Sequence, residues 1–153
     1  MDKGNKEERF QKWLSEAEQG NAKAQYYVAS SYYDGEGVPK DLSKALHWFK
    51  TVGAQGNMDA LYMVGMMYQF GKGVIPDMRE SFRWYLRAAE LGDAESQYRI
   101  GNSYYLGRGV LKDMVAAVAW WKKAAEQGHE KAKNNVSAAC YFGDGVPKKM
   151  EDS

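Results

Sequence analysis

Residues 104–113 read YYLGRGVLKD, and related segments recur along the chain at a spacing of 36 residues. The related segments are YYDGEGVPKD at 32–41, YQFGKGVIPD at 68–77 and CYFGDGVPKK at 140–149. A further glycine recurs with the same period, at positions 20, 56, 92 and 128. Self-similarity at a fixed period of about 20–50 residues is the signature of a repeat protein. The chain is therefore predicted to be an array of similar structural units.

Each repeat contains two apolar patterns of helical period on either side of the glycine-rich segment. In the first pattern, Ala24, Val28, Ala29 and Tyr32 lie at i, i+4, i+5 and i+8, which is one face of a helix. The Gly-x-Gly-Val segment is expected to end that helix, because glycine adopts the left-handed conformation at little cost. An aspartate then precedes the second helix and is expected to cap it, at Asp41, Asp77 and Asp113.

The second helix carries a tryptophan in every full repeat, and each tryptophan is followed by another aromatic residue. These tryptophans are Trp48, Trp84 and Trp120. Because they recur in register, we interpret them as packing residues.

The period divides the chain into three full repeats at 22–57, 58–93 and 94–129. Residues 1–21 are interpreted as the second helix of a preceding unit, and residues 130–153 as the first helix and loop of a fourth. One helical hairpin cannot bury its own apolar face, so neighbouring units must stack. We therefore predict an all-α fold, a right-handed α/α superhelical solenoid of antiparallel helix pairs that forms one domain over 1–153. The polar residues Asn134 and Ser137 are predicted to make the last unit an exposed cap.

These residues resemble the Sel1-like repeat family, which is related to tetratricopeptide repeats. The third repeat matches the family pattern best, through Tyr98, Ile100, Gly101, Tyr104, Gly107, Gly109, Val110, Asp113, Ala117, Trp120, Trp121, Ala124, Ala125 and Gly128. The alternative fold is a tetratricopeptide array, whose period is about 34 residues. The resemblance implies scaffolding and adaptor work, and it offers no catalytic residues to carry over.

Composition argues against several classes of function. The net charge is +1, from 21 basic and 20 acidic residues, so no nucleic-acid partner is predicted. No apolar run approaches the roughly 20 residues that cross a bilayer, so no membrane insertion is expected. The single cysteine, Cys140, suits a reducing compartment and predicts a cytoplasmic protein, with Cys140 as a small apolar core residue. His47 and His129 lack zinc-ligand spacing and are interpreted as solvated or capping residues, so no metal or other cofactor is predicted.

The candidate binding residues lie on the first helix of each repeat. By analogy with tetratricopeptide arrays, these helices line the concave surface, and positions that differ between repeats are not dictated by packing. Tyrosine and methionine are enriched in protein interfaces, and several stand at these positions. The predicted partner-binding residues are Tyr33, Asp34, Met66, Gln69, Phe70, Asn102, Tyr105, Leu106, Tyr141 and Phe142.

The sequence thus predicts a non-catalytic protein–protein interaction module, an adaptor or scaffold that holds another protein or a peptide in its concave groove. Three alternatives stay open at this point. The first is a bacterial immunity-type inhibitor of a toxin, which rests on family analogy. The second is a hydrolase acting on β-lactams, as in cysteine-rich relatives, although this chain has only one cysteine. The third is a structural solenoid that assembles end to end, whereas the favoured interpretation expects a monomer.

Overall fold

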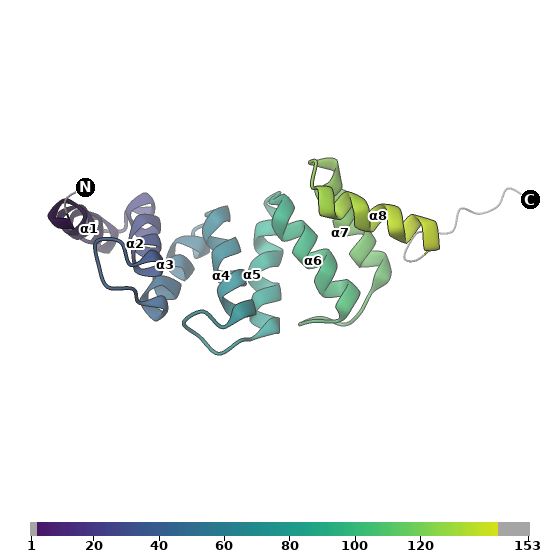
Figure 1. Ribbon diagram of the computed structural model, residues 1–153, viewed down its shortest axis with the longest axis horizontal. Coiled ribbons are helices and arrows are strands. Elements are labelled where there is room, and N and C mark those ends of the chain that lie inside the picture. The colour runs from purple at the N-terminus through teal and green to yellow at the C-terminus, as the bar shows by residue number, and fades with distance from the viewer. Residues whose placement is uncertain (1–2, 144–153) are drawn as a thin grey trace, which may run out of the picture. The chain divides into compact units, whose positions relative to one another are not determined.

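The computed structural model describes residues 3–143, which form eight α-helices and no strand (Figure 1). The helices are α1 (Lys3–Glu18), α2 (Ala22–Asp34), α3 (Leu42–Ala54), α4 (Met58–Phe70), α5 (Met78–Glu90), α6 (Ala94–Leu106), α7 (Met114–Glu126) and α8 (Glu130–Phe142). The prediction of an all-α fold built from repeated helix pairs is therefore confirmed. The predicted loop of the fourth unit begins at Gly143 and otherwise lies outside the described residues.

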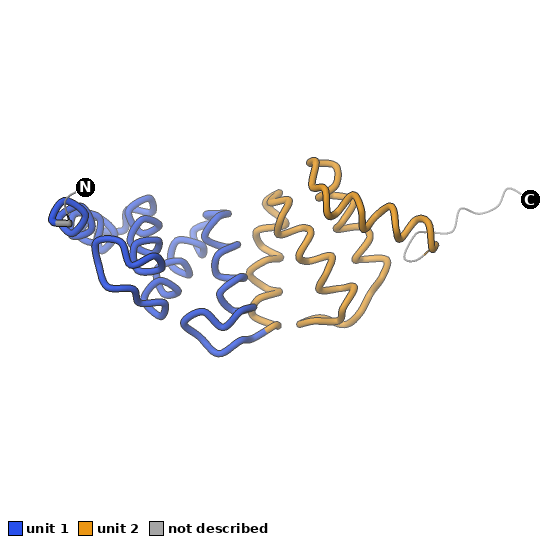
Figure 2. The backbone as a smooth tube through the Cα atoms, in the orientation of Figure 1, with its two compact units in different colours: residues 1–77 blue, residues 78–153 orange. Residues whose placement is uncertain are grey.

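The chain divides into two compact units, residues 1–77 and residues 78–153 (Figure 2). The first unit contains α1–α4 and the second contains α5–α8, and within each unit every helix packs against the next one along the chain. The repeat at 58–93 contributes α4 to the first unit and α5 to the second. The single-domain assignment stays a prediction.

The aspartate caps predicted from the sequence begin helices, and the predicted glycines end them, as expected. The Asp113 carboxylate accepts a hydrogen bond from the Ala116 backbone N–H at 3.0 Å, and the Asp41 carboxylate accepts one from the Lys44 backbone N–H at 3.0 Å. Gly107 follows α6 with a φ of 68°, in the left-handed region. The Asp113 N–H then donates to the Tyr104 carbonyl at 2.9 Å, which closes the loop between α6 and α7.

The core is formed by the first-helix face that the repeat pattern identified. Ala24, Val28, Ala29 and Tyr32 are all buried. The same positions of the next repeat, Ala60, Val64, Gly65 and Tyr68, are buried as well.

The structure corrects in part the interpretation of the repeated tryptophans as packing residues. Trp84 and Trp120 are only half-buried, whereas the aromatic residues that follow them, Tyr85 and Trp121, are 2% and 4% exposed. Consecutive residues on an α-helix point about 100° apart, so only one of the two rings can face the core. The indoles of Trp84 and Trp120 instead lie at the core edge under cations. The Arg87 guanidinium carbon is 5.3 Å from the Trp84 ring centroid, and Lys123 Nζ is 4.4 Å from the Trp120 ring centroid.

At the end of the described chain, the structure agrees with the cap prediction for two residues. It contradicts the separate prediction that Cys140 is a core residue. Asn134 and Ser137 are exposed, as predicted for a terminal helix. Cys140 is also exposed, so its interpretation as a small core residue is wrong. Its side chain is short and stands in the last turn of α8, and within residues 3–143 no further helix follows to cover it.

Candidate functional site

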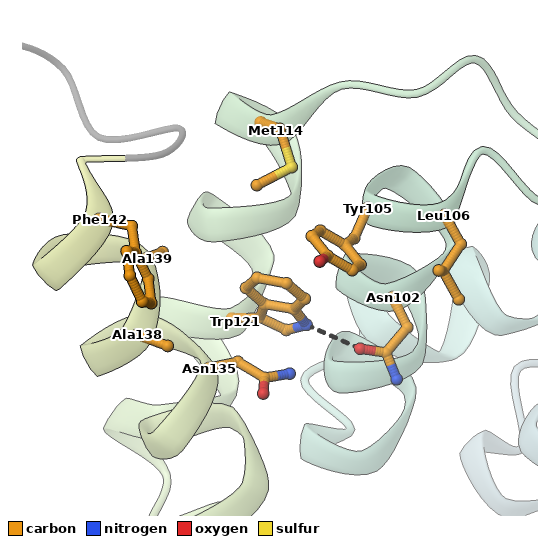
Figure 3. Close-up of a pocket in the computed structure, with 9 residues that line it drawn as sticks. All are labelled: Asn102, Tyr105, Leu106, Met114, Trp121, Asn135, Ala138, Ala139 and Phe142. Carbon is orange, nitrogen blue, oxygen red and sulfur yellow. Dashed lines mark hydrogen bonds between the residues drawn. The ribbon is translucent and has the colours of Figure 1, made fainter.

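The second unit contains a pocket of about 430 Å³ between α6, α7 and α8 (Figure 3). A pocket of this size with mainly apolar walls and a few polar groups is the usual form of a binding site. It is lined by Asn102, Tyr105 and Leu106 of α6, Met114 and Trp121 of α7, and Asn135, Ala138, Ala139 and Phe142 of α8.

Two lining residues of the pocket are buried, Ala139 and Trp121, and the Trp121 ring, which is 4% exposed, is held from two sides. Its indole Nε1–H donates a hydrogen bond to Asn102 Oδ1 at 3.0 Å (Figure 3). The Tyr105 ring lies with its centroid 5.5 Å from that of Trp121. Because the indole is buried and hydrogen-bonded, it offers a rigid aromatic surface to anything that enters the pocket.

Several large apolar side chains around the pocket are open to solvent. Tyr105 is 45% exposed, Leu106 is 50% exposed and Phe142 is 72% exposed. Covering apolar surface contributes roughly 25 cal/mol per Å² removed from water. A partner that covered these residues would therefore gain substantially from the hydrophobic effect.

Two asparagine amides, from facing helices, supply the polar groups of the pocket. Asn102 belongs to α6 and Asn135 to α8, and both are half-buried (Figure 3). Within residues 3–143, the Asn135 amide has no hydrogen-bond partner, and the Asn102 amide uses only its oxygen. A primary amide offers two N–H donors and one acceptor oxygen, which match the groups of a peptide backbone.

At the N-terminal ends of α6 and α8, a polar cluster fixes the two helices relative to each other. His129 caps α8, since its Nδ1 accepts from the Ala132 N–H at 3.2 Å, and its Nε2 lies 2.7 Å from Glu95 Oε2. Because Nδ1 is the acceptor, Nε2 carries the proton and donates to Glu95. The Tyr98 ring stacks on the imidazole with centroids 4.6 Å apart. The interpretation of His129 as a capping residue is confirmed.

The pocket brings together four of the predicted binding residues and omits a fifth from the same unit. Asn102, Tyr105, Leu106 and Phe142 line it, whereas Tyr141 is 85% exposed and lies against Phe142 with ring centroids 5.0 Å apart. Sequence reasoning missed the lining residues Met114, Trp121, Asn135, Ala138 and Ala139. Asn135 does carry a signal in the sequence, because it occupies a first-helix register where the earlier repeats have Tyr27, Met63 and Arg99.

The remaining predicted residues lie in the first unit, on α2 and α4. Phe70 is 57% exposed and Asp34 is exposed, and Met66 and Gln69 are half-buried. Tyr33 is also half-buried, with its ring centroid 6.4 Å from that of the buried Phe49. Tyr33 thus contributes to packing as well as to the surface.

This face of the first unit has an acidic character. Burial raises the pKa of the Tyr26 hydroxyl above its ordinary value, and the nearby carboxylates of Asp59 and Asp34 raise it further, against a hydrogen bond with Ser30 that lowers it. Both carboxylates therefore lie near the Tyr26 hydroxyl.

Two kinds of feature are absent from the described residues, a metal-binding cluster and a membrane-spanning helix. Residues 3–143 contain no group of three or more His, Cys, Asp or Glu side chains that could hold a metal ion. No helix in that part of the chain combines the length and the apolar character needed to cross a membrane.

Comparison with known proteins identifies the repeats. The family model described as Sel1 repeat matches residues 22–57, 59–93, 94–129 and 131–152. Among curated proteins none matches the chain. Sel1 repeat proteins are in general non-catalytic modules that bind other proteins.

Several solved structures are similar. The protein c5321, a protective antigen of uropathogenic Escherichia coli strains with an SLR fold, is 35% identical with a TM-score of 0.84, over 92% of this chain and 30% of that one. A Sel1 repeat protein of Oxalobacter formigenes is 34% identical with a TM-score of 0.87, over 94% and 59% of the two chains. The Helicobacter pylori cysteine rich protein B, at 22% identity, TM-score 0.66 and 88% and 96% coverage, shares the fold alone.

This chain therefore spans less than two thirds of the length of the first two proteins. The matched repeats cover most of its sequence, and the described helices α2–α7 follow one another as three helix pairs with the same spacing. The chain belongs to the Sel1 repeat family.

Proposed function

We propose that this chain is a non-catalytic interaction module that anchors a segment of a partner protein in the α6–α8 pocket. The observation that carries the proposal is the group of exposed apolar residues Tyr105, Leu106 and Phe142 around the buried Trp121. Aromatic residues clustered around a pocket are typical of the centre of a protein interface, where a few anchors supply most of the affinity.

The general role of Sel1 repeats as protein-binding modules supports this proposal. The exposed residues of the first unit, Asp34 and Phe70, would contribute a further contact surface on α2 and α4. The adaptor or scaffold role follows if the partner is held without being changed chemically. The alternative of a toxin inhibitor differs only in the identity of the partner, so the same experiment distinguishes the two.

The expected result of replacing Leu106 by glutamate is loss of partner capture without loss of the fold. A carboxylate at the wall of an apolar pocket must be desolvated when the partner binds, which is costly without a partner charge. Leu106 is 50% exposed, so the free protein accommodates the change. The measurement is affinity capture from a source lysate followed by mass spectrometry, and then calorimetric titration of the recovered partner. We expect affinity to fall at least about tenfold, which is about 1.4 kcal/mol.

The matched control is Leu111→Glu, because Leu111 is 88% exposed and does not line the pocket. Both variants introduce the same charge, so a difference between them reports on the position alone. Equal capture by Leu106→Glu and by the unmodified chain would contradict the proposal. Circular dichroism melting of all three proteins establishes that the variants are folded.

A second expectation concerns end-to-end assembly. Tyr141 and Phe142 are 85% and 72% exposed at the end of α8, which is the observation that favours a self-assembling solenoid. If these residues serve a different partner, light scattering over a concentration series should give a constant mass near 17.3 kDa. A mass that rises with concentration, and returns to the monomer value in Tyr141→Glu, would favour self-assembly instead.

A further inference from the structure

We infer that the α6–α8 pocket takes a bulky apolar side chain of the partner segment, and that the residues flanking this side chain in the partner are acidic. The inference deepens the proposed function and rests on it, because it assigns a chemistry to the segment that the pocket would hold.

The apolar part of the inference follows from the lining of the pocket. None of its lining residues is charged, so a charged side chain inside it would lose its hydration without gaining an opposite charge. The α8 wall is made of the small residues Ala138 and Ala139, whereas the same positions two repeats earlier are Met66 and Met67. The missing side-chain volume beside Trp121 is the space that an aromatic or large aliphatic group would fill.

The extended form of the ligand is indicated by the two amides. The Asn102 amide keeps its N–H groups available, and the Asn135 amide keeps all of its groups available, within the part of the chain that the structure describes. They stand on the two helices that face each other across the pocket (Figure 3). An extended peptide has unpaired backbone N–H and C=O groups on either side of an anchoring side chain, and an amide can both donate to and accept from them. A helical ligand would already have satisfied those groups internally.

The acidic flanks follow from two cations near the pocket. Lys112 Nζ lies 5.9 Å from the centroid of the Tyr105 ring, which lines the pocket. Lys131 is exposed and stands four residues before Asn135, on the same face of α8. Among residues 3–143, neither lysine has an ion-pair partner.

The carboxylates of the same three helices are largely engaged elsewhere. Asp93 and Asp113 cap helices, Glu95 pairs with Arg99 and His129, and Glu130 pairs with Lys133. The exception is Glu126 in the last turn of α7, for which the described part of the chain provides no partner. The charge that remains available beside the pocket is therefore positive, and opposite charges on a ligand would set its register and speed its association.

The first unit shows that this chemistry is specific to α6–α8. Two repeats earlier, Asp34 stands in the position of Leu106 and Asp59 in the position of Lys131. The equivalent face of α2 and α4 therefore offers carboxylates where the α6–α8 face offers an apolar group and a cation. Lys40 keeps the position of Lys112, so a ligand with acidic flanks should bind there more weakly, and the first unit is an internal reference for the experiment.

The test is selection of random dodecapeptides displayed on phage against the full chain, with the recovered peptides then measured by fluorescence anisotropy. The expected result is enrichment of peptides in which Phe, Trp, Leu or Met is flanked by Asp or Glu. Ala138→Trp, which fills the pocket from an exposed position, should weaken their binding at least tenfold. Leu106→Glu is the second variant for the same comparison.

The charge part of the inference has its own matched pair of variants. Lys112→Glu combined with Lys131→Glu should weaken binding about tenfold and abolish its decrease with added salt. The control is Lys72→Glu combined with Lys122→Glu, which changes net charge equally at exposed lysines outside the pocket. The control should bind like the unmodified chain.

Four outcomes would overturn the inference. Enrichment of peptides with basic flanks would contradict the charge assignment. Acidic–apolar peptides whose binding survives both Ala138→Trp and Leu106→Glu would place their site elsewhere. Peptides that are lost on Phe70→Glu but not on Ala138→Trp would reject this inference and the α6–α8 pocket as the anchoring site, and would move the proposed interaction to the first unit. A selection that returns no binding peptide, together with no captured partner, would reject both this inference and the proposed function.

Discussion

Replacing Gly109 by alanine is expected to lower the free energy of unfolding by about 3 kcal/mol or more, because two penalties combine. Gly109 has a φ of 74°, where a side chain costs roughly 1–2 kcal/mol. An added Cβ would also overlap the Met78 carbonyl oxygen and lie 2.6 Å from its carbon. Met78 is the first residue of α5, and its backbone cannot rotate away as a flexible side chain could. Overpacking of this kind costs about 1–3 kcal/mol.

Gly128→Ala is the matched comparison for this prediction. Gly128 has a φ of 90°, but an added Cβ there would meet nothing within 4 Å. It should therefore cost only the conformational strain, roughly 1–2 kcal/mol. Urea denaturation followed by circular dichroism measures both variants, with the slope of the transition as a check that the same surface unfolds. Equal losses in the two variants would show that the contact with α5 contributes nothing.

The second large effect is a coupling between Gly101 and Trp121, the residue on which the candidate pocket is built. A Cβ at Gly101 would overlap Trp121 Cδ1 and lie 2.5 Å from its Nε1. Gly101→Ala gains about 1 kcal/mol in helix propensity and loses about 1–3 kcal/mol by overpacking. We expect a net destabilisation of up to about 2 kcal/mol.

An earlier repeat of the chain indicates a second substitution that should compensate for Gly101→Ala. Two repeats earlier the corresponding residues are Ala29 and Phe49, so the chain itself uses alanine opposite a smaller ring. Gly101→Ala combined with Trp121→Phe should therefore be more stable than the sum of the two single changes indicates, by about 1–3 kcal/mol. Strict additivity in a double-mutant cycle of urea unfolding would show that the two residues do not compete for this space. Trp121→Phe also removes the hydrogen bond to Asn102, so the single variant serves as the reference for that loss.

The substitutions at Gly109 and Gly101 should affect the pocket differently. Gly109 holds the loop after α6 against the start of α5, so its replacement should destabilise the unit without changing the pocket lining. Gly101 instead determines how closely the Trp121 indole approaches α6, so its replacement should move a lining residue. Peptide binding by the folded Gly101→Ala protein would accordingly be weakened more than its stability alone explains.

The sequence by itself determined the repeat, the helix boundaries and the caps of this protein. The glycines that recur every 36 residues, Asp113 before α7 and Asp41 before α3 each act on backbone groups within a few residues of themselves. A left-handed glycine or a capping carboxylate ends or begins a helix through local backbone geometry and hydrogen bonding. Such signals can be recognised without knowing what lies across the interface. Tyr105, Leu106 and Phe142 were identified differently, because they stand at first-helix positions that vary between repeats.

Only the tertiary structure decided which aromatic of each pair faces the core and where a pocket forms. Trp121 rather than Trp120 is buried, because the orientation of α7 against α6 and α8 turns one ring inward and the other to the edge. The pocket arises because small Ala138 and Ala139 on one helix face Trp121 on another, a combination that no single segment contains. The exposure of Cys140 has the same origin. Packing depends on volumes brought together from different helices, so it follows from the assembled fold and not from local pattern.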